Sequence, residues 1–541
     1  MAKKVTFSLD GKTVEAEEGA LVIEVAKANG IEIPHYCYHE ALGNPGTCRL
    51  CICEVEGAPK PMVSCRLPAR EGLVVKTNSP TARRAQASSL EFHLANHPLD
   101  CPVCDQAGEC FLQDYYQKFG LYTSSVREDK HHKPKRVDIG GHVMLDAERC
   151  ILCTRCVRFL DKITGTGELG IFERGDRSVL APYPGKRVDN PYSGNIVDIC
   201  PVGALTDKDF RFSVRVWYLE RSPSVCTGCS RGCSIEVHAN NKRRWHASGR
   251  RAARLKPRFN PEVNGHWMCD EGRYSYKAID AKTRLSAVSA LREGAPRKAS
   301  WDEALGSIAG ELREACRVKG SQGLAVVLSA TLSNEDLFAA KLLFVDTLKA
   351  GQLLLAPGPD QLGEEDQLLR KKEKVPNLRG AQAMGFGAAI EESSWEKIRE
   401  GAGRGAIWGL WIVDRDPVAV WGKTAAAAAL KPLSFSLYQG SQSNHFVQEA
   451  RWALPSCSFA EEESTFTNFE GQVQRTAQAF PPLGEARADW EIFGGVLKAL
   501  GEPFPFESAR SVFAALCSKE KAFAGLDWEG LGEFGKRLGG K

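Results

Sequence analysis

The stretch around which this chain is organised reads His97-Pro-Leu-Asp-Cys101-Pro-Val-Cys104-Asp-Gln-Ala-Gly-Glu-Cys110. It brings one imidazole and three thiols together in a His-x3-Cys-x2-Cys-x5-Cys pattern. Thiolate and imidazole are soft ligands that bind zinc, copper or iron-sulfur centres in proteins. The spacings of the cysteines on either side of this stretch therefore decide which metal it binds, and they favour iron and sulfur.

Cysteine is concentrated in the first half of the chain. Of the 19 cysteines, 16 lie between Cys37 and Cys269, and only Cys316, Cys457 and Cys517 follow. The first ten residues turn polar where a signal peptide would need an apolar core, so we expect no secretory context of the kind that favours disulfides. We therefore expect reduced thiols that act as metal ligands.

Length and charge set further limits. A chain of 541 residues exceeds a single hydrophobic core, which seldom grows beyond roughly 250 to 300 residues, so we expect about four or five domains. The formal net charge of only +4 does not call for a nucleic-acid partner. No uncharged apolar run of about 18 residues occurs, because even residues 406–421 contain Asp414, Arg415 and Asp416. We expect no direct membrane insertion, and a protein that is soluble or peripheral to a membrane.

The N-terminal segment predicts a small fold of strands around one helix. Apolar and polar residues alternate around Asp10-Gly11 and indicate a β-hairpin, and residues 20–28 indicate a short helix. A C-x10-C-x2-C-x13-C pattern follows, formed by Cys37, Cys48, Cys51 and Cys65. Four matched spacings favour a [2Fe-2S] cluster held by four thiolates over buried structural cysteines. Cys53 continues a strand one step past a ligand, and we expect it in the core.

Two predicted helices, residues 81–94 and 113–119, flank the His-Cys stretch, and Pro98 and Pro102 keep its loop from continuing either helix. A histidine beside cysteines is often structural, but this one precedes three thiols that lack a fourth donor. Residues 91–116 closely resemble, over their whole length, the [4Fe-4S] motif of respiratory complex I and related hydrogenases in which one histidine joins three cysteines. The ligands predicted here are His97, Cys101, Cys104 and Cys110.

The third set combines three close cysteines with one remote cysteine, and it consists of Cys150, Cys153, Cys156 and Cys200. A C-x2-C-x2-C run with a distant Cys-Pro is the bacterial ferredoxin arrangement, in which the remote cysteine completes the cluster of a second run. This chain has only one such run. We therefore expect Cys200 to complete the same [4Fe-4S] cluster as the three close cysteines.

The fourth set is a C-x2-C-x3-C run with a distant fourth cysteine, formed by Cys226, Cys229, Cys233 and Cys269. It resembles the opening segment of molybdopterin oxidoreductases, where such cysteines hold a [4Fe-4S] cluster. By spacing alone, a four-cysteine zinc ribbon is the alternative.

Two polar segments are interpreted as surface. In the basic loop of residues 127–136, no cysteine lies near His131 or His132 in the sequence, so we expect surface histidines. Residues 242–258 carry eight cations and one Trp, a patch that a nucleic-acid-binding protein would use, but they contain no nucleic-acid-binding motif. A solvated or subunit-facing surface is the favoured interpretation.

From Ala299 strands and helices alternate, which predicts an α/β domain with a largely parallel sheet. We expect capped helices after Ser300 and Ser333. Strands are expected over residues 324–328, 353–356, 406–413 and 433–437. Four segments of this chain resemble landmarks of the molybdopterin oxidoreductase fold, namely residues 300–305, 334–337, 461–474 and 486–490.

This domain departs from active molybdoenzymes in two ways. After Asn334-Glu-Asp the active enzymes present a cysteine, selenocysteine or serine to the metal, whereas residues 337–361 contain neither Cys nor Ser. The domain is also short. We therefore expect no molybdenum or tungsten, and a fold kept for shape and interfaces.

Residues 3–500 resemble the family of large iron-sulfur subunits, called G subunits, of bacterial NADH-quinone oxidoreductase (respiratory complex I), because the four motifs occur in the same order. The resemblance implies an electron-transfer subunit of this translocase that passes single electrons from the flavin of a partner subunit toward quinone. It implies one [2Fe-2S] cluster, three [4Fe-4S] clusters and no catalytic residue, so the isolated chain is not expected to be catalytic. The implied partners are the flavin-containing NADH-binding subunit and the next iron-sulfur subunit toward quinone, at the cytoplasmic face of the inner membrane.

The fold class that follows is a multidomain α+β and α/β chain. The expected domains are a β-grasp [2Fe-2S] ferredoxin fold over residues 1–80, a helical one-His/three-Cys [4Fe-4S] segment over 81–120, a ferredoxin-like [4Fe-4S] segment over 121–218, a molybdopterin-oxidoreductase-type [4Fe-4S] domain over 219–275 and a degenerate molybdopterin-oxidoreductase-like α/β domain over 276–541.

Two other functions stay open. An electron-carrying subunit of a soluble NAD-linked hydrogenase or formate dehydrogenase would share the first motifs. A formate dehydrogenase would need the metal ligand that is missing after Asn334, and an iron-only hydrogenase would need further clustered cysteines after residue 270. A zinc-rich regulatory or nucleic-acid-binding protein would use residues 242–258. Colour separates these classes, because zinc sites are colourless and iron-sulfur sites are brown.

Overall fold

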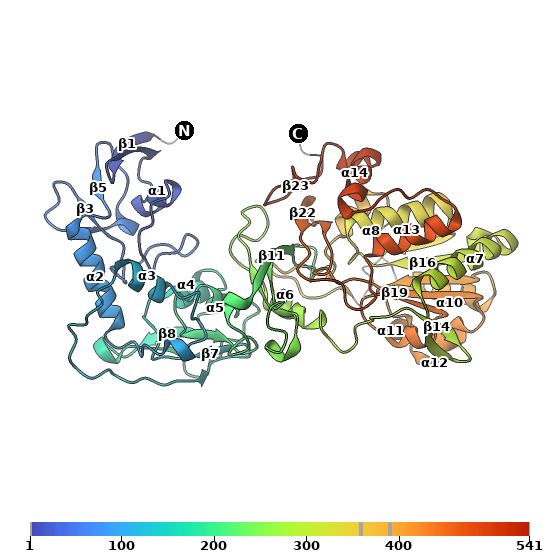
Figure 1. Ribbon diagram of the computed structural model, residues 1–541, viewed down its shortest axis with the longest axis horizontal. Helices are drawn as coiled ribbons and strands as arrows, with labels where there is room; N and C mark the ends of the chain where they lie inside the picture. Colours follow the sequence, from blue (N-terminus) through green and yellow to red (C-terminus); the bar gives the residue numbers. More distant parts are fainter. Residues whose placement is uncertain (1–2, 356–360, 388–391, 540–541) are drawn as a thin grey trace. The chain divides into compact units, whose positions relative to one another are not determined.

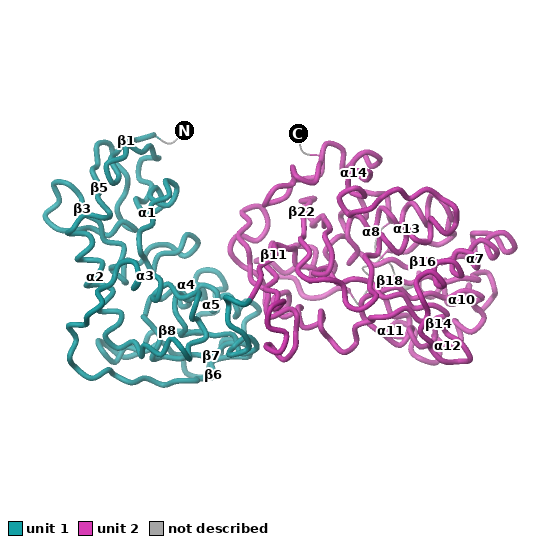
Figure 2. Tube along the Cα trace, viewed as in Figure 1, with its two compact units in different colours: residues 1–218 teal, residues 219–541 magenta. Residues whose placement is uncertain are grey.

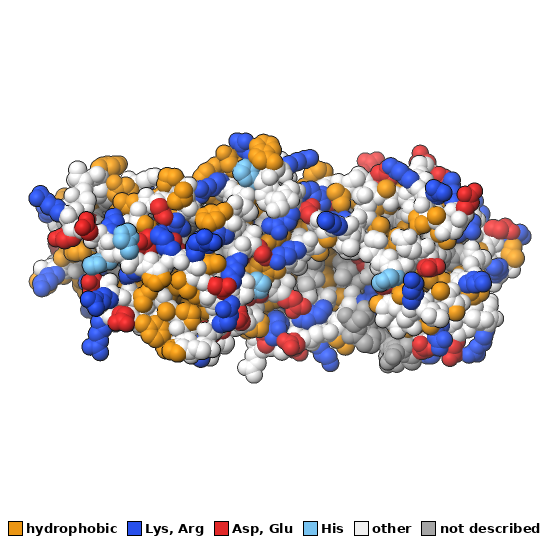
Figure 3. All heavy atoms as spheres, turned by 90° about the horizontal axis from the view of Figure 1, so that it is seen from below, with side chains coloured by type: hydrophobic (Ala, Val, Ile, Leu, Met, Phe, Trp, Pro, Cys, Tyr) orange, Lys and Arg blue, Asp and Glu red, His pale blue; other side chains and the backbone are white. Residues whose placement is uncertain are grey.

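The computed structural model describes residues 3–355, 361–387 and 392–539 (Figure 1). The chain divides into two compact units, Met1–Tyr218 and Leu219–Lys541 (Figure 2). No helix in the described ranges is long and apolar enough to cross a membrane. On the face drawn in Figure 3, basic and acidic side chains are interspersed, in keeping with the small net charge.

A five-stranded mixed sheet with one helix opens unit 1, as the sequence predicts. Val5, Phe7 and Leu9 alternate into the core, and the Asp10-Gly11 turn has positive φ at both residues (50° and 81°), as a type I′ hairpin requires. The strand order is β2-β1-β5-β3-β4. The elements are β1 Lys4–Leu9, β2 Lys12–Glu17, α1 Val22–Ala28, β3 Ile52–Val55, β4 Met62–Val63 and β5 Val74–Lys76.

Two helices flank the His-Cys stretch where the sequence predicts them. Helix α2, Pro80–Leu94, starts after Ser79, whose side chain accepts a hydrogen bond from the backbone nitrogen of Ala82. Pro80 is the first helical residue, a position where its missing N–H costs nothing. The loop that follows contains the short 3-10 helix η2 (Cys101–Val103), and α3 spans Phe111–Phe119.

The rest of unit 1 consists of short strands and helices. A three-stranded sheet has the order β10-β7-β6, and β8 pairs with β9. The elements are β6 Val137–Asp138, β7 Val143–Leu145, α4 Arg155–Lys162, β8 Leu169–Phe172, β9 Val179–Pro182, α5 Asn195–Asp198 and β10 Leu205–Asp207.

Unit 2 contains two small sheets beside its main one. The sheet β11-β12-β13 is antiparallel and precedes the short helix α6, and the sheet β21-β22-β23 includes strands from the end of the chain. The elements are β11 Glu220–Val225, β12 Ser234–Ala239, β13 Ala252–Pro257, α6 Asp270–Arg273, β21 Ser464–Thr467, β22 Gln472–Thr476 and β23 Lys536–Arg537.

A seven-stranded sheet of order β15-β14-β20-β19-β18-β16-β17 forms the centre of unit 2. Five neighbouring strands are parallel, as the alternation of strands and helices predicts, and β14 and β15 add an antiparallel edge. In β16, Val326 and Leu328 pack in a core with α7, α8, α13 and α14, whereas Ala325 and Val327 pack with α10 and α12. Helices therefore cover both faces of the sheet (Figure 1).

The strands of this sheet are β14 Ser289–Arg292, β15 Ala295–Lys298, β16 Leu324–Leu328, β17 Gln352–Leu355, β18 Gly409–Val413, β19 Phe435–Gly440 and β20 Trp452–Pro455. The helices are α7 Trp301–Lys319, α8 Asn334–Ala340, the π-helix η8 Lys341–Thr347, α9 Leu378–Ala383, α10 Glu392–Gly403, α11 Pro417–Trp421, α12 Lys423–Leu430, α13 Asp489–Leu500 and α14 Ala509–Lys519. Ser300 and Ser333 cap α7 and α8 as predicted. The predicted strands after residue 350 correspond to β17, β18 and β19, but Ala356 lies outside the described residues.

Candidate iron-sulfur sites

The structure brings the four cysteines of the first set together. Cys37 and Cys48 lie within hydrogen-bonding reach of each other, as do Cys51 and Cys65, and none of the four side chains is more than 6% exposed. The hydrogen bond from Cys48 lowers the pKa of Cys37, and the hydrogen bond from Cys65 lowers the pKa of Cys51. Each pair therefore favours one thiolate, the form of sulfur that binds iron. Cys53 is fully buried and its thiol donates to the carbonyl of Met62, as expected of a core residue.

The second set lies between α2 and α3. Cys101 begins η2, Cys104 directly follows it, and Cys110 immediately precedes α3. His97 is 9% exposed, and its Nδ1 has no hydrogen-bond partner among the described residues. Burial lowers the pKa of His97 to about 4, so the ring is neutral near pH 7 and has a free lone pair. A buried ring nitrogen without a partner, four residues before the first of three thiols in the sequence, fits a metal ligand.

The third set lines a small apolar pocket. Its four cysteines face the same space as Ile171, Leu180 and Leu205. Burial raises the pKa of Cys150 to about 12 and that of Cys153 to about 11, so these thiols ionise only where a cation such as iron compensates the charge.

A glycine connects the third set to the second. Gly203, in the Cys200-Pro-Val-Gly-Ala sequence, lies so close to the Cys104 sulfur that a Cβ at this position would collide with it. Packing therefore requires a glycine at position 203, because the missing Cβ leaves room for Cys104, a predicted ligand of the second set.

The fourth set is built in unit 2 around β11, β12 and α6. Its cysteines are 5% to 8% exposed, and Cys269 caps α6 by accepting a hydrogen bond from the backbone nitrogen of Gly272. A Cβ added to Gly272 would lie 2.7 Å from the Cys226 sulfur and 3.6 Å from the Cys269 sulfur. Cys226 of the C-x2-C-x3-C run and the distant Cys269 therefore both lie next to Gly272. Burial and the neighbouring thiols raise the pKa of Cys233 and Cys226 above the ordinary thiol value.

One apolar core contains predicted ligands from all three sets of unit 1. Cys37 and Cys48 of the first set, Cys110 of the second and Cys153 of the third belong to it, and two partly buried cysteines of the third set pack against it. The three predicted sites therefore adjoin one another through apolar side chains.

Two buried side chains beside the predicted ligands gave no functional signal in the sequence. Tyr36 is fully buried, and its hydroxyl has no hydrogen-bond partner among the described residues. Arg155 is 5% exposed and lies between Cys153 and Cys156. In the sequence, the only indication for Tyr36 and Arg155 is that each directly precedes a predicted cysteine ligand.

Within the described residues, no three His, Cys, Asp or Glu side chains form a group that could hold a single metal ion. The cysteines of a [4Fe-4S] cluster bind different iron atoms, so a cluster does not require such a group.

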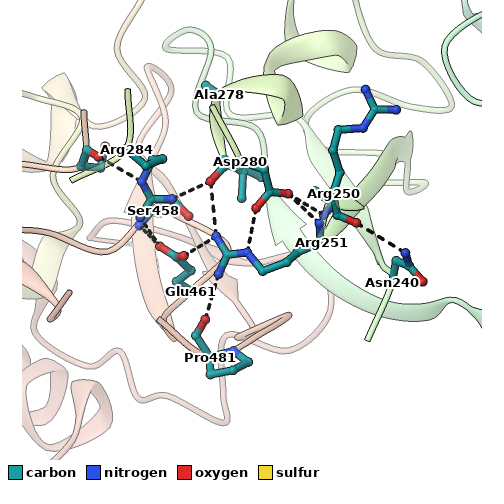
Figure 4. A network of polar contacts seen from close by, with 12 residues as sticks. Asn240, Arg250, Arg251, Ala278, Asp280, Arg284, Ser458, Glu461 and Pro481 are labelled. Atoms are coloured by element: carbon teal, nitrogen blue, oxygen red, sulfur yellow. Dashed lines mark hydrogen bonds and ion pairs between the residues drawn. The ribbon is translucent and has the colours of Figure 1, made fainter. Parts of the chain in front are cut away.

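The two predicted surface segments differ in outcome. The side chains of His131 and His132 are 60% and 87% exposed, and each faces a carboxylate, as expected of surface histidines. In the basic segment, Arg251 departs from the expected solvated surface, because it is 18% exposed and forms ion pairs with Asp280 and Glu461 (Figure 4). Part of this positive charge therefore holds unit 2 together.

The molybdopterin-type landmarks meet in a buried polar network. Asn334 and Glu335 exchange hydrogen bonds with Thr465 of β21, and Asp336 accepts one from the backbone nitrogen of Trp490. Beside this network lies a cavity of about 550 Å³. Its lining includes Asp336, Asp414, Asp416, Glu462 and Asp489, together with Thr227 and Gly228 from the loop of the fourth cysteine set.

Four family models match the chain. They describe a 2Fe-2S iron-sulfur cluster binding domain (residues 2–80), the NADH-ubiquinone oxidoreductase-G iron-sulfur binding region (86–125), the ferredoxin-like domain of NADH-quinone oxidoreductase subunit 3 (140–206) and molybdopterin oxidoreductase (377–499). The first three matches contain the predicted ligands of the first three sets.

Curated relatives match nearly the whole chain. The mitochondrial NADH-ubiquinone oxidoreductase 78 kDa subunit of Neurospora crassa is 29% identical, with 97% of this chain and 84% of the relative covered. The NADH-quinone oxidoreductase G subunit of Rickettsia conorii is 27% identical, with 97% and 92% covered. Among solved structures, a chain of an NAD⁺-reducing [NiFe]-hydrogenase is 36% identical over 39% of this chain and 91% of that chain, with a TM-score of 0.36.

Proposed function

Since the chain belongs to the family of NADH-quinone oxidoreductase G subunits, we propose that it carries single electrons through respiratory complex I, from the flavin of a partner subunit toward quinone. The observation that carries this proposal is the shared apolar core, in which ligands of three predicted clusters pack together. A chain of adjoining one-electron sites needs no substrate pocket between them.

The predicted ligands would hold one [2Fe-2S] cluster and three [4Fe-4S] clusters. Iron-sulfur clusters accept and release single electrons. The protein's part is to supply thiolates and one neutral imidazole, to bury them, and to exclude water from the space between the sites. Buried thiols whose pKa is raised and the partnerless Nδ1 of His97 support this assignment, because iron would satisfy both. The fourth set lies in unit 2 and contributes no residue to the shared core.

The C-terminal α/β domain is proposed to hold neither molybdenum nor tungsten. The segment that follows Asn334-Glu-Asp in active enzymes has no thiol or hydroxyl of Cys or Ser here, and Leu337 and Phe338 are buried in the core. Asp336 takes part in the cap of α8 and accepts a hydrogen bond from α13, and Asn334 donates one to Thr465 of β21. These polar residues therefore have a structural role.

The proposed partners are the flavin-containing NADH-binding subunit and the next iron-sulfur subunit toward quinone, in an arm at the cytoplasmic face of the inner membrane. Both follow from the electron path, because the chain offers no flavin or quinone motif of its own and must exchange electrons across interfaces at both ends.

The test is to purify the tagged chain from gently solubilised membranes and to assay what accompanies it. We expect flavin and NADH-quinone oxidoreductase activity to copurify, and no NADH oxidation by the chain alone with an artificial acceptor. A Cys156→Ala variant should keep NADH oxidation by an acceptor that is reduced at the flavin, and lose quinone reduction. Hydrogenase or formate dehydrogenase activity in the purified complex would favour the alternative function, and turnover by the pure chain would refute the proposal.

A further inference from the structure

Arg155 connects the ligand loops of two predicted clusters. It is the first residue of α4 and is 5% exposed. Its guanidinium donates one hydrogen bond to the carbonyl of Tyr38 (2.6 Å) and another to the carbonyl of Ile199 (3.3 Å). Tyr38 directly follows Cys37 of the first set, and Ile199 directly precedes Cys200 of the third. One side chain is therefore fixed between the [2Fe-2S] loop and the loop that closes the ferredoxin-like [4Fe-4S] site.

The charge of Arg155 has no carboxylate partner within the described residues. Its remaining polar atom, Nε, is buried without a hydrogen-bond partner there, and the guanidinium lies over the Phe111 ring at 5.7 Å. The acidic groups that act on it are the thiols of Cys37, Cys153 and Cys200 and the phenol of Tyr115. A buried guanidinium is costly unless negative charge compensates it, so the compensation must come from the sulfur ligands.

Two other arginines of unit 1 are placed differently. Arg149 is equally buried, but it donates to Asp100 at 3.0 Å and lies 3.5 Å from Asp146, so its charge is already neutralised. Arg158, one turn after Arg155, is partly exposed and donates to the carbonyls of Leu42, Gly43 and Cys37. Like Arg155 it lies near the thiols of Cys37 and Cys153, so it is a second cation beside the first and third sets, with more solvent around it.

We propose that Arg155 is the counter-ion shared by the [2Fe-2S] cluster of the first set and the [4Fe-4S] cluster of the third, and that its charge raises the reduction potential of both. This inference rests on the proposed function, since it needs clusters at both sites. A site of four thiolates is negative and becomes more negative on reduction, so a fixed cation at its edge stabilises the reduced form. A cation held between two such sites acts on both, and it also lowers the repulsion between them when both carry an electron.

The experiment is a redox titration of the purified complex, followed by low-temperature EPR, with wild type and the variants Arg155→Gln, Arg155→Lys and Arg83→Gln. In Arg155→Gln both cluster signals should persist. Both midpoint potentials should fall by about 59 mV, which corresponds to a tenfold change in the equilibrium constant of a one-electron reduction. Arg155→Lys keeps the charge and should restore most of each potential. Arg83→Gln removes an exposed charge of α2 and should change neither.

Potentials in Arg155→Gln that equal those of wild type would overturn the proposal, and a shift of only one cluster would refute the sharing. If Arg155→Gln does not assemble, Arg155→Met replaces it, because Met has a similar length and carries no charge. Both potentials should fall in this variant as well, relative to wild type and to Arg155→Lys. Potentials of Arg155→Met that equal those of wild type would refute the proposal. Absence of the two EPR signals from wild-type complex would instead refute the assignment of the clusters.

Discussion

Arg284 donates a hydrogen bond of 2.6 Å to Glu461, and both side chains are almost completely buried (Figure 4). The same carboxylate pairs at 2.7 Å with Arg251, which directly precedes β13, and Arg251 also pairs with Asp280. Two cations and two anions thus form a row of ion pairs that joins the start of β13 to the loop before β21. This cluster gives part of the basic segment a role within unit 2.

Replacing Glu461 by Gln should destabilise unit 2 strongly. Arg251 would keep Asp280, but Arg284 would have no carboxylate partner among the described residues, and breaking a buried ion pair typically costs about 3–5 kcal/mol. The measurement is urea unfolding followed by the fluorescence of the tryptophans, most of which belong to unit 2. Glu400→Gln is the matched control, because its ion pair with Arg404 is exposed and should contribute little. Equal unfolding midpoints for the two variants would show that the buried cluster does not stabilise the unit.

His97→Ala should remove or convert one [4Fe-4S] signal in low-temperature EPR of the reduced protein, while the signals of the other clusters persist. The reason is that three thiols leave one iron atom without its fourth protein ligand. His131→Ala serves as the control, since this histidine is exposed and lies outside the ligand pattern. A spectrum of His97→Ala that is indistinguishable from that of the control would exclude His97 as a ligand.

Glu335→Gln should reduce the pH dependence of stability. Burial raises the pKa of Glu335 from the ordinary 4.5 to about 8, so the folded chain keeps a proton that the unfolded chain loses between these values. Stability from this group is complete below about pH 4.5 and declines as the pH rises toward 8. Gln can keep both contacts with Thr465, because its oxygen accepts from the backbone nitrogen and its NH2 group can donate to Oγ1, and it cannot ionise.

The melting temperature of the variant relative to wild type should therefore rise by several degrees between pH 5 and 8, because 1 kcal/mol shifts the melting temperature by about 2–4 °C in domains of about 150–250 residues and by less in the larger unit 2. Differential scanning fluorimetry at several pH values measures this difference. A difference in melting temperature between variant and wild type that is the same at every pH would mean that Glu335 ionises normally in the folded chain.

Elemental analysis should find about 14 iron atoms per chain, after subtraction of the iron in other subunits, and neither molybdenum nor tungsten. Cys269→Ala should lower the iron content by up to four atoms if the fourth set holds a [4Fe-4S] cluster. Loss of zinc in that variant, with unchanged iron, would assign the fourth set to zinc. Stoichiometric molybdenum or tungsten would make the C-terminal domain catalytic.

The sequence predicted what local spacing determines. The hairpin at Asp10-Gly11, the two helices around the His-Cys stretch and the caps at Ser300 and Ser333 depend on neighbouring residues, and the structure confirms them. Cysteine spacing likewise predicted sets that the structure brings close together. The sequence could not predict which cations are buried, because Arg155 and Arg251 differ from exposed arginines only in what the distant chain places around them.

The apolar core shared by the three predicted ligand sets should link the maturation of the proposed clusters. Before metal insertion, burial keeps the thiols of Cys110 and Cys153 in this core protonated. A cluster that binds at one site fixes side chains that also line the next, so its binding free energy helps to order the neighbouring pocket. Insertion of the proposed clusters should therefore be cooperative along unit 1, and oxidative loss of one of them should weaken the retention of the others.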